Sequence, residues 1–211
     1  MLEVKIFKVG SIPTNCYIIK DVDKNIGVIV DPGGESNELE QEIFSLKEVK
    51  YILLTHGHFD HILKAKKYRE MTGSKIVISE LDKAFTQDNF LNLSNKFLRR
   101  SKGKLDNFDA DVFVKEGDEL SFAGTSFKVM STPGHTQGSV CYILGDKIFS
   151  GDTLFSGDCG YARFPTGNKE ELKNSIHKLY DLNTESSDYI VYPGHAEITL
   201  LSQEKLNKTG I

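Results

Sequence analysis

Short apolar runs alternate with amphipathic segments along most of the chain. Residues 14–20 and 26–30 are apolar and rich in β-branched side chains, and the polar residues between them predict a hairpin. After Ser36, a typical helix-capping residue, apolar positions recur at helical spacing. A further helix is predicted over residues 62–72 and should end at Gly73. The alternation of strand and helix favours an α/β fold.

The remaining elements follow the same pattern. Short strands are predicted over residues 49–54, 75–78, 120–122, 127–130, 140–144, 147–150 and 189–192. A helix is predicted over residues 169–180 and the start of another over 80–85, whereas residues 90–108 have no regular pattern. No repeat or low-complexity linker divides the chain, so we expect one domain over residues 1–211. Its two halves each supply a sheet and helices, which favours a layered sandwich.

Composition narrows the class of protein. The 211 residues include 26 basic and 30 acidic side chains, for a formal net charge of −4, which gives no reason to expect a nucleic-acid partner. Apolar runs such as 52–54 are far shorter than the ~20 residues that cross a bilayer, and charges interrupt the N-terminal stretch where a signal peptide is apolar. Cys16, Cys141 and Cys159 are too far apart for a CxxC motif. We therefore expect a cytoplasmic protein with reduced thiols and no membrane partner.

The densest group of metal-binding side chains directly follows the strand predicted at 49–54. The sequence Thr-His-Gly-His-Phe-Asp-His supplies four donors, His56, His58, Asp60 and His61. His56 and His58 are two residues apart, so at a strand end they can reach the same side. Asp60 and His61 lie beyond the turn, where a second ion can sit.

Three later turns carry a donor at the equivalent place, just past a predicted strand. They supply His135, Asp152 and His195. In open α/β sheets, sites assemble in the crevice beyond the carboxyl ends of the strands. We therefore expect these three donors to meet the first four in one cleft.

Five imidazoles and two carboxylates are enough to hold two divalent ions. The predicted ligands are His56, His58 and His135 for one ion, Asp60, His61 and His195 for the other, and Asp152 as the bridge. Each ion keeps a position open for water, which indicates catalysis rather than a closed structural site. Zinc fits this histidine-rich set, and iron and manganese accept it too. Taken singly, each donor is better explained as a satisfied turn or capping residue, and only the set together favours a metal site. His177, in the predicted helix, is expected to be solvated.

At these residues the sequence resembles the metallo-β-lactamase-fold hydrolases, whose His-x-His-x-Asp-His motif, later His, bridging Asp and final His all have a counterpart here. The resemblance covers nearly the whole chain and implies a four-layer αββα sandwich with a dinuclear site at one edge of the paired sheets. The motifs at 31–33, 133–136, 151–155 and 193–195 are most similar to glyoxalase II-like enzymes, which hydrolyse hydroxyacylglutathione thioesters. The chain resembles the short form, without the C-terminal helical region that helps to hold glutathione. Leu63 and Lys64 stand where the family often has Gly-Gly.

The resemblance implies hydrolysis of an acyl thioester or ester by a metal-bridging hydroxide that attacks the carbonyl. Asp60 would orient the water or take its proton while serving as a ligand. A leaving thiolate, with a parent pKa of about 8.5, needs little protonation, which favours thioesters over amides. No base adjoins Cys159 in the sequence, so a covalent cysteine mechanism is disfavoured.

Candidate substrate-binding residues follow the Asp152 turn, in a segment at 160–167 that is similar to one in the short glyoxalase II-like proteins. Arg163 and the basic residues at 98–104 are candidates for binding glutathione carboxylates, although a solvated helix end is the favoured interpretation of residues 99–104. Tyr161 is a candidate for lining an acyl pocket, together with Phe155 and Phe164, and core packing is the alternative for these aromatic residues.

Three other functions fit the same superfamily. A persulfide dioxygenase-like oxidoreductase uses the fold with one iron, and metal content separates it from a dinuclear hydrolase. A nuclease would need added RNA-clamping regions and a less negative charge. A noncatalytic binding module would have lost ligands, and all seven are present. The acyl group and the oligomeric state stay open.

Overall fold

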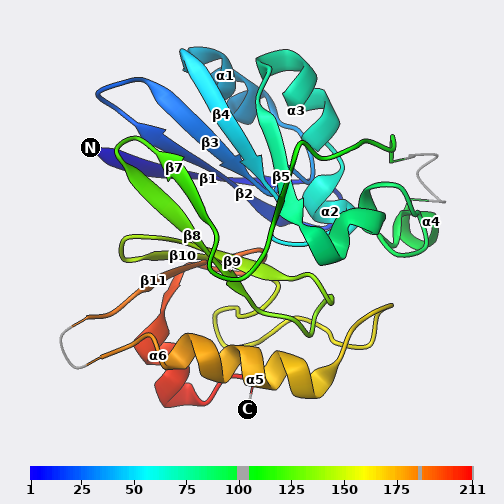
Figure 1. Cartoon of the computed structure of the whole chain (residues 1–211), viewed down its shortest axis with the longest axis vertical. Helices are drawn as coiled ribbons and strands as arrows, with labels where there is room; N and C mark the ends of the chain where they lie inside the picture. Colours follow the sequence, from blue (N-terminus) through cyan, green and yellow to red (C-terminus); the bar gives the residue numbers. More distant parts are fainter. Residues whose placement is uncertain (99–104, 185–186, 211) are drawn as a thin grey trace. The chain divides into compact units, whose positions relative to one another are not determined.

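The computed structural model describes residues 1–98, 105–184 and 187–210. They form two compact units, one containing Met1–Ile78 and Lys83–Phe113 and the other Ser79–Asp82 and Val114–Ile211. Among the described residues, no helix combines the length and the apolar character that crossing a bilayer requires. Each unit is built on one sheet (Figure 1).

The first unit contains a six-stranded sheet in which the strands lie in chain order, β1 to β6. The strands are β1 (Leu2–Val9), β2 (Thr14–Asp21), β3 (Ile26–Val30), β4 (Glu48–Leu53), β5 (Lys75–Ser79) and β6 (Val112–Val114). β1, β2 and β3 are antiparallel, whereas β3, β4 and β5 are parallel. The helices are α1 (Asn37–Ser45), α2 (Phe59–Ile62), α3 (Ala65–Thr72) and α4 (Ser94–Phe97). A 3-10 helix at Glu80–Thr86 begins in the second unit and continues into the first from Lys83. Because β3 and β4 are parallel, α1 crosses over between them and buries Leu39 and Ile43 in the core.

The second unit contains another six-stranded sheet, in the order β12-β11-β10-β9-β8-β7. Its strands are β7 (Glu119–Phe122), β8 (Thr125–Ser131), β9 (Val140–Leu144), β10 (Lys147–Gly151), β11 (Ile190–Pro193) and β12 (Thr199–Leu200). Its helices are α5 (Lys169–Tyr180) and α6 (Leu201–Asn207). The strands pair antiparallel except β10 and β11, which α5 connects as a parallel pair. Leu172, Ile176 and Leu179 of α5 pack with Ile148 and Val191 of these strands to form the core.

Most predicted elements are present. The predicted hairpin is β2 and β3, and the helix predicted at 169–180 is α5. Ser36 caps α1, since its hydroxyl accepts a hydrogen bond from the Leu39 N–H at 3.1 Å. Gly73 ends α3 in the left-handed region, with φ +71°.

Two helix predictions were wrong in detail. The segment predicted as one helix at 62–72 is two helices, because the Lys64 N–H donates to the Pro32 carbonyl and the backbone leaves helical geometry there. The segment at 80–85 is a 3-10 helix rather than an α-helix. Short 3-10 segments are common in connections between other elements. In this one, the Asp82 carboxylate accepts hydrogen bonds from Thr136 and Gly138.

The sequence pattern did not predict β1, β6, β12, α6 or α4, which lies in the stretch 90–108 where no regular element was expected. β6 and β12 have three and two residues, which is too short for periodicity to register. β1 is an edge strand interrupted by the charged residues Glu3, Lys5 and Lys8, and α4 and α6 are short helices of four and seven residues. Pairing and packing partners, rather than local pattern, define these five elements.

Candidate metal centre

The segment after β4 gathers four of the predicted donors within the first unit. His56, His58 and His61 are 1%, 2% and 0% exposed. The His56 ring centroid lies 4.8 Å from that of His58 and 4.2 Å from that of His61. Asp60 occupies the first turn of α2, with Oδ2 3.8 Å from His61 Nε2. A buried group of three imidazoles beside a carboxylate is typical of a metal site.

Two glycines allow this segment to pack closely. A Cβ on Gly57 would lie 2.2 Å from Cβ of Phe85, and one on Gly33 would lie 1.3 Å from the Asp60 carbonyl oxygen. Real Cβ atoms do not approach other heavy atoms so closely, so a larger side chain must displace either Phe85 or the backbone at Asp60. The glycines therefore fix the donors by letting neighbouring elements touch their backbone.

Asp31 supports these donors, and the sequence analysis assigned it no role. It follows β3, is 1% exposed, and accepts hydrogen bonds from the Thr55 N–H at 2.8 Å and the Thr55 hydroxyl at 2.7 Å. Asp31 Oδ2 also lies 2.9 Å from His61 Nδ1, and Thr55 Oγ1 lies 3.1 Å from His56 Nδ1. The position of Asp31 at a strand end, in the same Asp-Pro-Gly motif that carried the family resemblance, was the available signal.

These contacts assign the histidine tautomers. The Thr55 hydroxyl donates to Asp31, so its oxygen accepts the Nδ1 hydrogen of His56, and Asp31 accepts that of His61 directly. Nε2 is then the nitrogen that carries the lone pair on both rings. Metal-binding histidines are held in this way, with the other ring nitrogen donating to an oxygen.

Asp31→Asn is expected to weaken zinc binding by about 10- to 100-fold, because an amide N–H cannot accept the His61 or Thr55 hydrogens. It should also lower the free energy of unfolding of the metal-free protein by about 1–3 kcal/mol. Chelator competition and urea unfolding measure the two effects. Asp21→Asn is the matched control, because Asp21 is also buried and accepts backbone hydrogen bonds in the β2–β3 turn. Equal losses of zinc affinity in both variants would refute the role of Asp31.

The second unit gathers the other three predicted donors at its strand ends. His135 lies in the loop after β8, Asp152 directly follows β10, and His195 follows β11. Asp152 Oδ2 lies 3.3 Å from His135 Nε2, and its Oδ1 lies 3.7 Å from His195 Nε2. Two ligands bound about 2.0–2.1 Å from one tetrahedral ion are about 3.4 Å apart. Each oxygen of Asp152 therefore faces one imidazole at the spacing of a shared ion.

The segment Gly160–Gly167 lies beside these donors. His135 Nδ1 lies 2.9 Å from the Tyr161 carbonyl oxygen, which assigns the metal-binding lone pair of His135 to Nε2 as well. A Cβ on Gly160 would lie 1.9 Å from the Asp152 carbonyl oxygen and 2.9 Å from His135 Nδ1. The glycine thus lets this segment lie against both donors.

The predicted substrate residues lie on the same segment. Tyr161 is 53% exposed, and Arg163 is also exposed. The Tyr161 ring contacts Phe164, whose ring faces His135 with centroids 6.3 Å apart, and Phe155 faces His195 at 5.7 Å. The aromatic candidates therefore flank the donors of this unit. Of the basic segment at 98–104, residues 99–104 lie outside the described residues.

His177 and Cys159 were predicted to take no part in metal binding or catalysis. His177 is exposed on α5, as expected for a solvated helix residue. Burial, with a smaller contribution from the Asp158 carboxylate, raises the pKa of the half-buried Cys159 thiol. A raised pKa is the opposite of what activates a thiol nucleophile.

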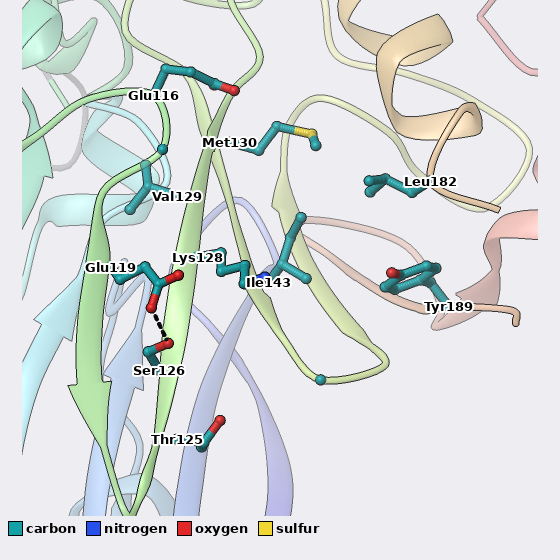
Figure 2. Close-up of a pocket in the computed structure, with 12 residues that line it drawn as sticks. Glu116, Glu119, Thr125, Ser126, Lys128, Val129, Met130, Ile143, Leu182 and Tyr189 are labelled. Atoms are coloured by element: carbon teal, nitrogen blue, oxygen red, sulfur yellow. Dashed lines mark hydrogen bonds between the residues drawn. The ribbon is translucent and has the colours of Figure 1, made fainter.

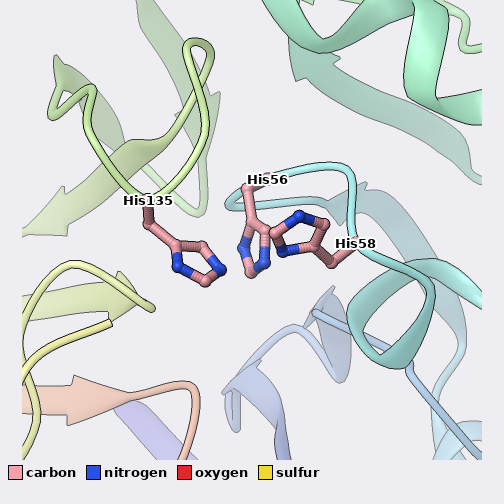
Figure 3. A group of neighbouring side chains, drawn as sticks. All are labelled: His56, His58 and His135. Carbon is pink, nitrogen blue, oxygen red and sulfur yellow. The ribbon is translucent and has the colours of Figure 1, made fainter. Parts of the chain in front are cut away.

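The donor set fits divalent metals of the zinc and iron type. Imidazole nitrogens and carboxylate oxygens are borderline ligands that zinc, iron and manganese accept. Figure 3 draws His56 and His58, on the loop that follows β4, and His135, on the loop that follows β8. Their assignment as ligands of a common ion stays a prediction.

A groove of about 460 Å³ in the second unit contains none of the predicted site residues. Figure 2 shows Lys128, Met130 and Ile143 on strands β8 and β9, with Leu182 and Tyr189 on the opposite wall. Its charged residues include Glu119, which accepts a hydrogen bond from Ser126, and Glu116, which pairs with Lys178. The groove therefore offers no donor set comparable to that of the strand ends.

The sequence profile of the metallo-beta-lactamase superfamily matches residues 9–195. The chain belongs to this superfamily. Among curated relatives, the hydroxyacylglutathione hydrolase GloC of Haemophilus influenzae is 37% identical, over 97% of this chain and 95% of its own length. A crystal structure of the BLEG-1 B3 metallo-beta-lactamase is 31% identical and superposes with a TM-score of 0.86, covering 96% of each chain. The structure of TTHA1623 in a di-iron-bound form is 28% identical, with a TM-score of 0.79 over 95% of this chain and 96% of its own.

Membership of the metallo-beta-lactamase superfamily confirms the predicted fold class, α/β with the metallo-β-lactamase fold. It also confirms the resemblance stated on the His-x-His-x-Asp-His motif and its later partners. With a His/Asp cluster of metal-binding type, the chain is a metal-dependent hydrolase of this superfamily.

Proposed function

We propose that this protein is a dinuclear-metal-dependent thioesterase that hydrolyses acyl thioesters such as hydroxyacylglutathione. The observation that carries the proposal is the Asp152 carboxylate, whose two oxygens each face a different imidazole, as a carboxylate that bridges two ions must. The 37% identity to a hydroxyacylglutathione hydrolase over nearly the full length of both chains supports the substrate class.

We propose that the two donor sets together hold two divalent ions, with Asp152 as the bridge. The proposed ligands are His56, His58 and His135 for one ion and Asp60, His61 and His195 for the other. Zinc suits the imidazole-rich set, and iron is the alternative because a similar protein is described in a di-iron-bound form. When bound, such ions lower the pKa of a shared water toward about 7 and polarise an acyl carbonyl.

The side chains of this chain would orient the reactants. We propose that Asp60 accepts a hydrogen from the attacking water, since an ionised carboxylate accepts and does not donate. Asp31 and Thr55 hold His61 and His56 in the tautomer that presents Nε2. Phe155 and Phe164 flank His195 and His135, and we propose that they exclude bulk water from the acyl group. Tyr161 and Arg163 are proposed substrate contacts because both are exposed on the same segment.

The leaving group separates thioesters from β-lactams, the substrates suggested by the B3 metallo-beta-lactamase to which the chain is similar. A thiolate has a parent pKa of about 8.5 and leaves without protonation, whereas an amide nitrogen must be protonated as it leaves. Among the residues that the structure describes, we assign no proton donor to that task beyond the proposed ligands. Thioester hydrolysis is therefore the proposed activity.

The test combines metal analysis with turnover. The purified protein should contain two divalent ions per chain and hydrolyse S-D-lactoylglutathione, while a cephalosporin and a plain aryl ester react at least about tenfold more slowly. Removal of the ions with a chelator should abolish turnover, and added zinc should restore it. One iron per chain with dioxygen uptake on glutathione persulfide would instead support the oxidoreductase alternative. Full thioesterase activity after complete chelation would refute the proposal.

A further inference from the structure

We infer that Asp82 is a positioning residue for His135 and therefore determines the affinity of one of the two proposed metal positions. Asp82 lies on the 3-10 helix, more than fifty residues before His135, and is 0% exposed. Its segment, Ser79–Asp82, belongs to the second unit although the residues on either side belong to the first. This segment is hydrogen-bonded to the His135 loop.

Three hydrogen bonds join the two segments. The Thr136 hydroxyl donates to Asp82 Oδ2 at 2.7 Å, and the Gly138 N–H donates to Asp82 Oδ1 at 2.9 Å. The Gln137 side-chain amide donates to the Leu81 carbonyl at 2.8 Å. Both oxygens of the carboxylate therefore receive a hydrogen from the loop, which compensates the cost of burying its charge.

The hydrogen bond from Thr136 to Asp82 also restrains the adjacent residue, His135. The Gly134 N–H donates to the Thr136 carbonyl at 2.9 Å, so the residues directly before and after His135 are hydrogen-bonded to each other. Ser139 completes the turn, because its hydroxyl oxygen accepts the Thr136 N–H at 3.0 Å and lies 2.8 Å from the Thr136 hydroxyl oxygen. Holding Thr136 thus fixes the backbone from which the His135 ring projects.

Close packing of Gly138 against Asp82 also restricts the position of the loop. A Cβ on Gly138 would lie 2.5 Å from Asp82 Oδ1 and 2.6 Å from the Asp82 backbone nitrogen. Removing the carboxylate would leave a buried hydroxyl and a buried N–H without their acceptor, and the loop would reorganise to satisfy them. A shift of the His135 ring by about 1 Å is enough to disturb metal coordination.

The first test uses the metal-free protein and no substrate. In Asp82→Ala, hydrogen exchange of the peptide that covers the loop 133–139 should accelerate at least about tenfold, while peptides of the loop 55–61 keep their rate. Asp188→Ala is the matched control, because Asp188 also accepts hydrogen bonds from a hydroxyl and backbone N–H groups in the same unit. Equal acceleration in the control, or none in Asp82→Ala, would overturn the inference.

The second test measures zinc. This part rests on the proposed function for the assignment of His135 as a ligand. Asp82→Ala should lower the affinity for one of the two zinc ions by about tenfold or more and leave the affinity for the other within about twofold of the wild type. A general loss of stability would not produce this difference between the two ions. Thr136→Ser should bind zinc as the wild type does, and Thr136→Val should reproduce the loss, which keeps the inference testable if Asp82→Ala fails to fold. Unchanged zinc affinity in Thr136→Val would overturn the inference.

The two hypotheses fail differently. If the wild-type protein shows no thioester hydrolysis but Asp82→Ala still loses one zinc ion selectively, the proposed function fails and the positioning role stands. If the wild type hydrolyses thioesters and Asp82→Ala binds both ions normally, the positioning role fails alone.

Discussion

Asp152→Ala is expected to lower the rate of thioester hydrolysis by more than about a thousandfold and to reduce the bound metal to at most one ion per chain. The two oxygens of Asp152 lie 3.3 Å from His135 Nε2 and 3.7 Å from His195 Nε2. An alanine removes the proposed bridge and leaves both imidazoles without a shared carboxylate. A thousandfold loss corresponds to about 4 kcal/mol of transition-state free energy, which is within what a catalytic metal pair contributes.

The measurement for Asp152→Ala is metal content by elemental analysis together with the rate on S-D-lactoylglutathione. Two variants serve as controls in the same unit. His177→Ala removes an exposed imidazole from α5, and Asp146→Ala removes an exposed carboxylate that pairs with Lys147 in the turn before β10. Both should keep two ions and the wild-type rate within about twofold. An equal loss in His177→Ala and Asp152→Ala would show that the ligand assignment is wrong.

Gly33→Ala should destabilise the protein by more than about 3 kcal/mol and lower zinc affinity at the Asp60 and His61 donors. The added methyl would lie 1.3 Å from the Asp60 carbonyl oxygen and 2.3 Å from its carbonyl carbon. Because both atoms are backbone, no rotamer change relieves the overlap, and the start of α2 must move. Movement of α2 carries His61 away from Asp31, on which its tautomer depends.

Urea unfolding and zinc competition test the Gly33→Ala prediction against a second glycine in the same unit. Gly73 has φ +71°, and a methyl added there would meet nothing within 4 Å, so Gly73→Ala introduces conformational strain without a clash. Gly73→Ala should lower the free energy of unfolding by about 1 kcal/mol and leave zinc affinity unchanged. If the two substitutions had the same effect on zinc affinity, close approach at Gly33 would not be what positions Asp60 and His61.

The local sequence was sufficient for much of the fold and for the identity of the candidate donors. Helix α5 was predicted with its observed bounds from the helical spacing of its apolar residues, and the structure shows that Asn168 caps its first turn. The family resemblance also followed from local motifs, since all seven donors stand in short turns of recognisable spacing. The break between α2 and α3 was not predictable in this way, because the Pro32 carbonyl that accepts the Lys64 N–H lies thirty-two residues earlier.

Local sequence is enough to predict which side chains can bind metal and that each follows a strand, because donor chemistry and strand periodicity are properties of neighbouring residues. The groups that hold those donors in place could be identified only from the folded chain. Asp31 reaches His61 across thirty residues, and Asp82 reaches Thr136 across fifty-four. Neither carboxylate has a local pattern that predicts its partner, because such hydrogen bonds depend on where two distant chain segments meet and on the burial that makes them strong.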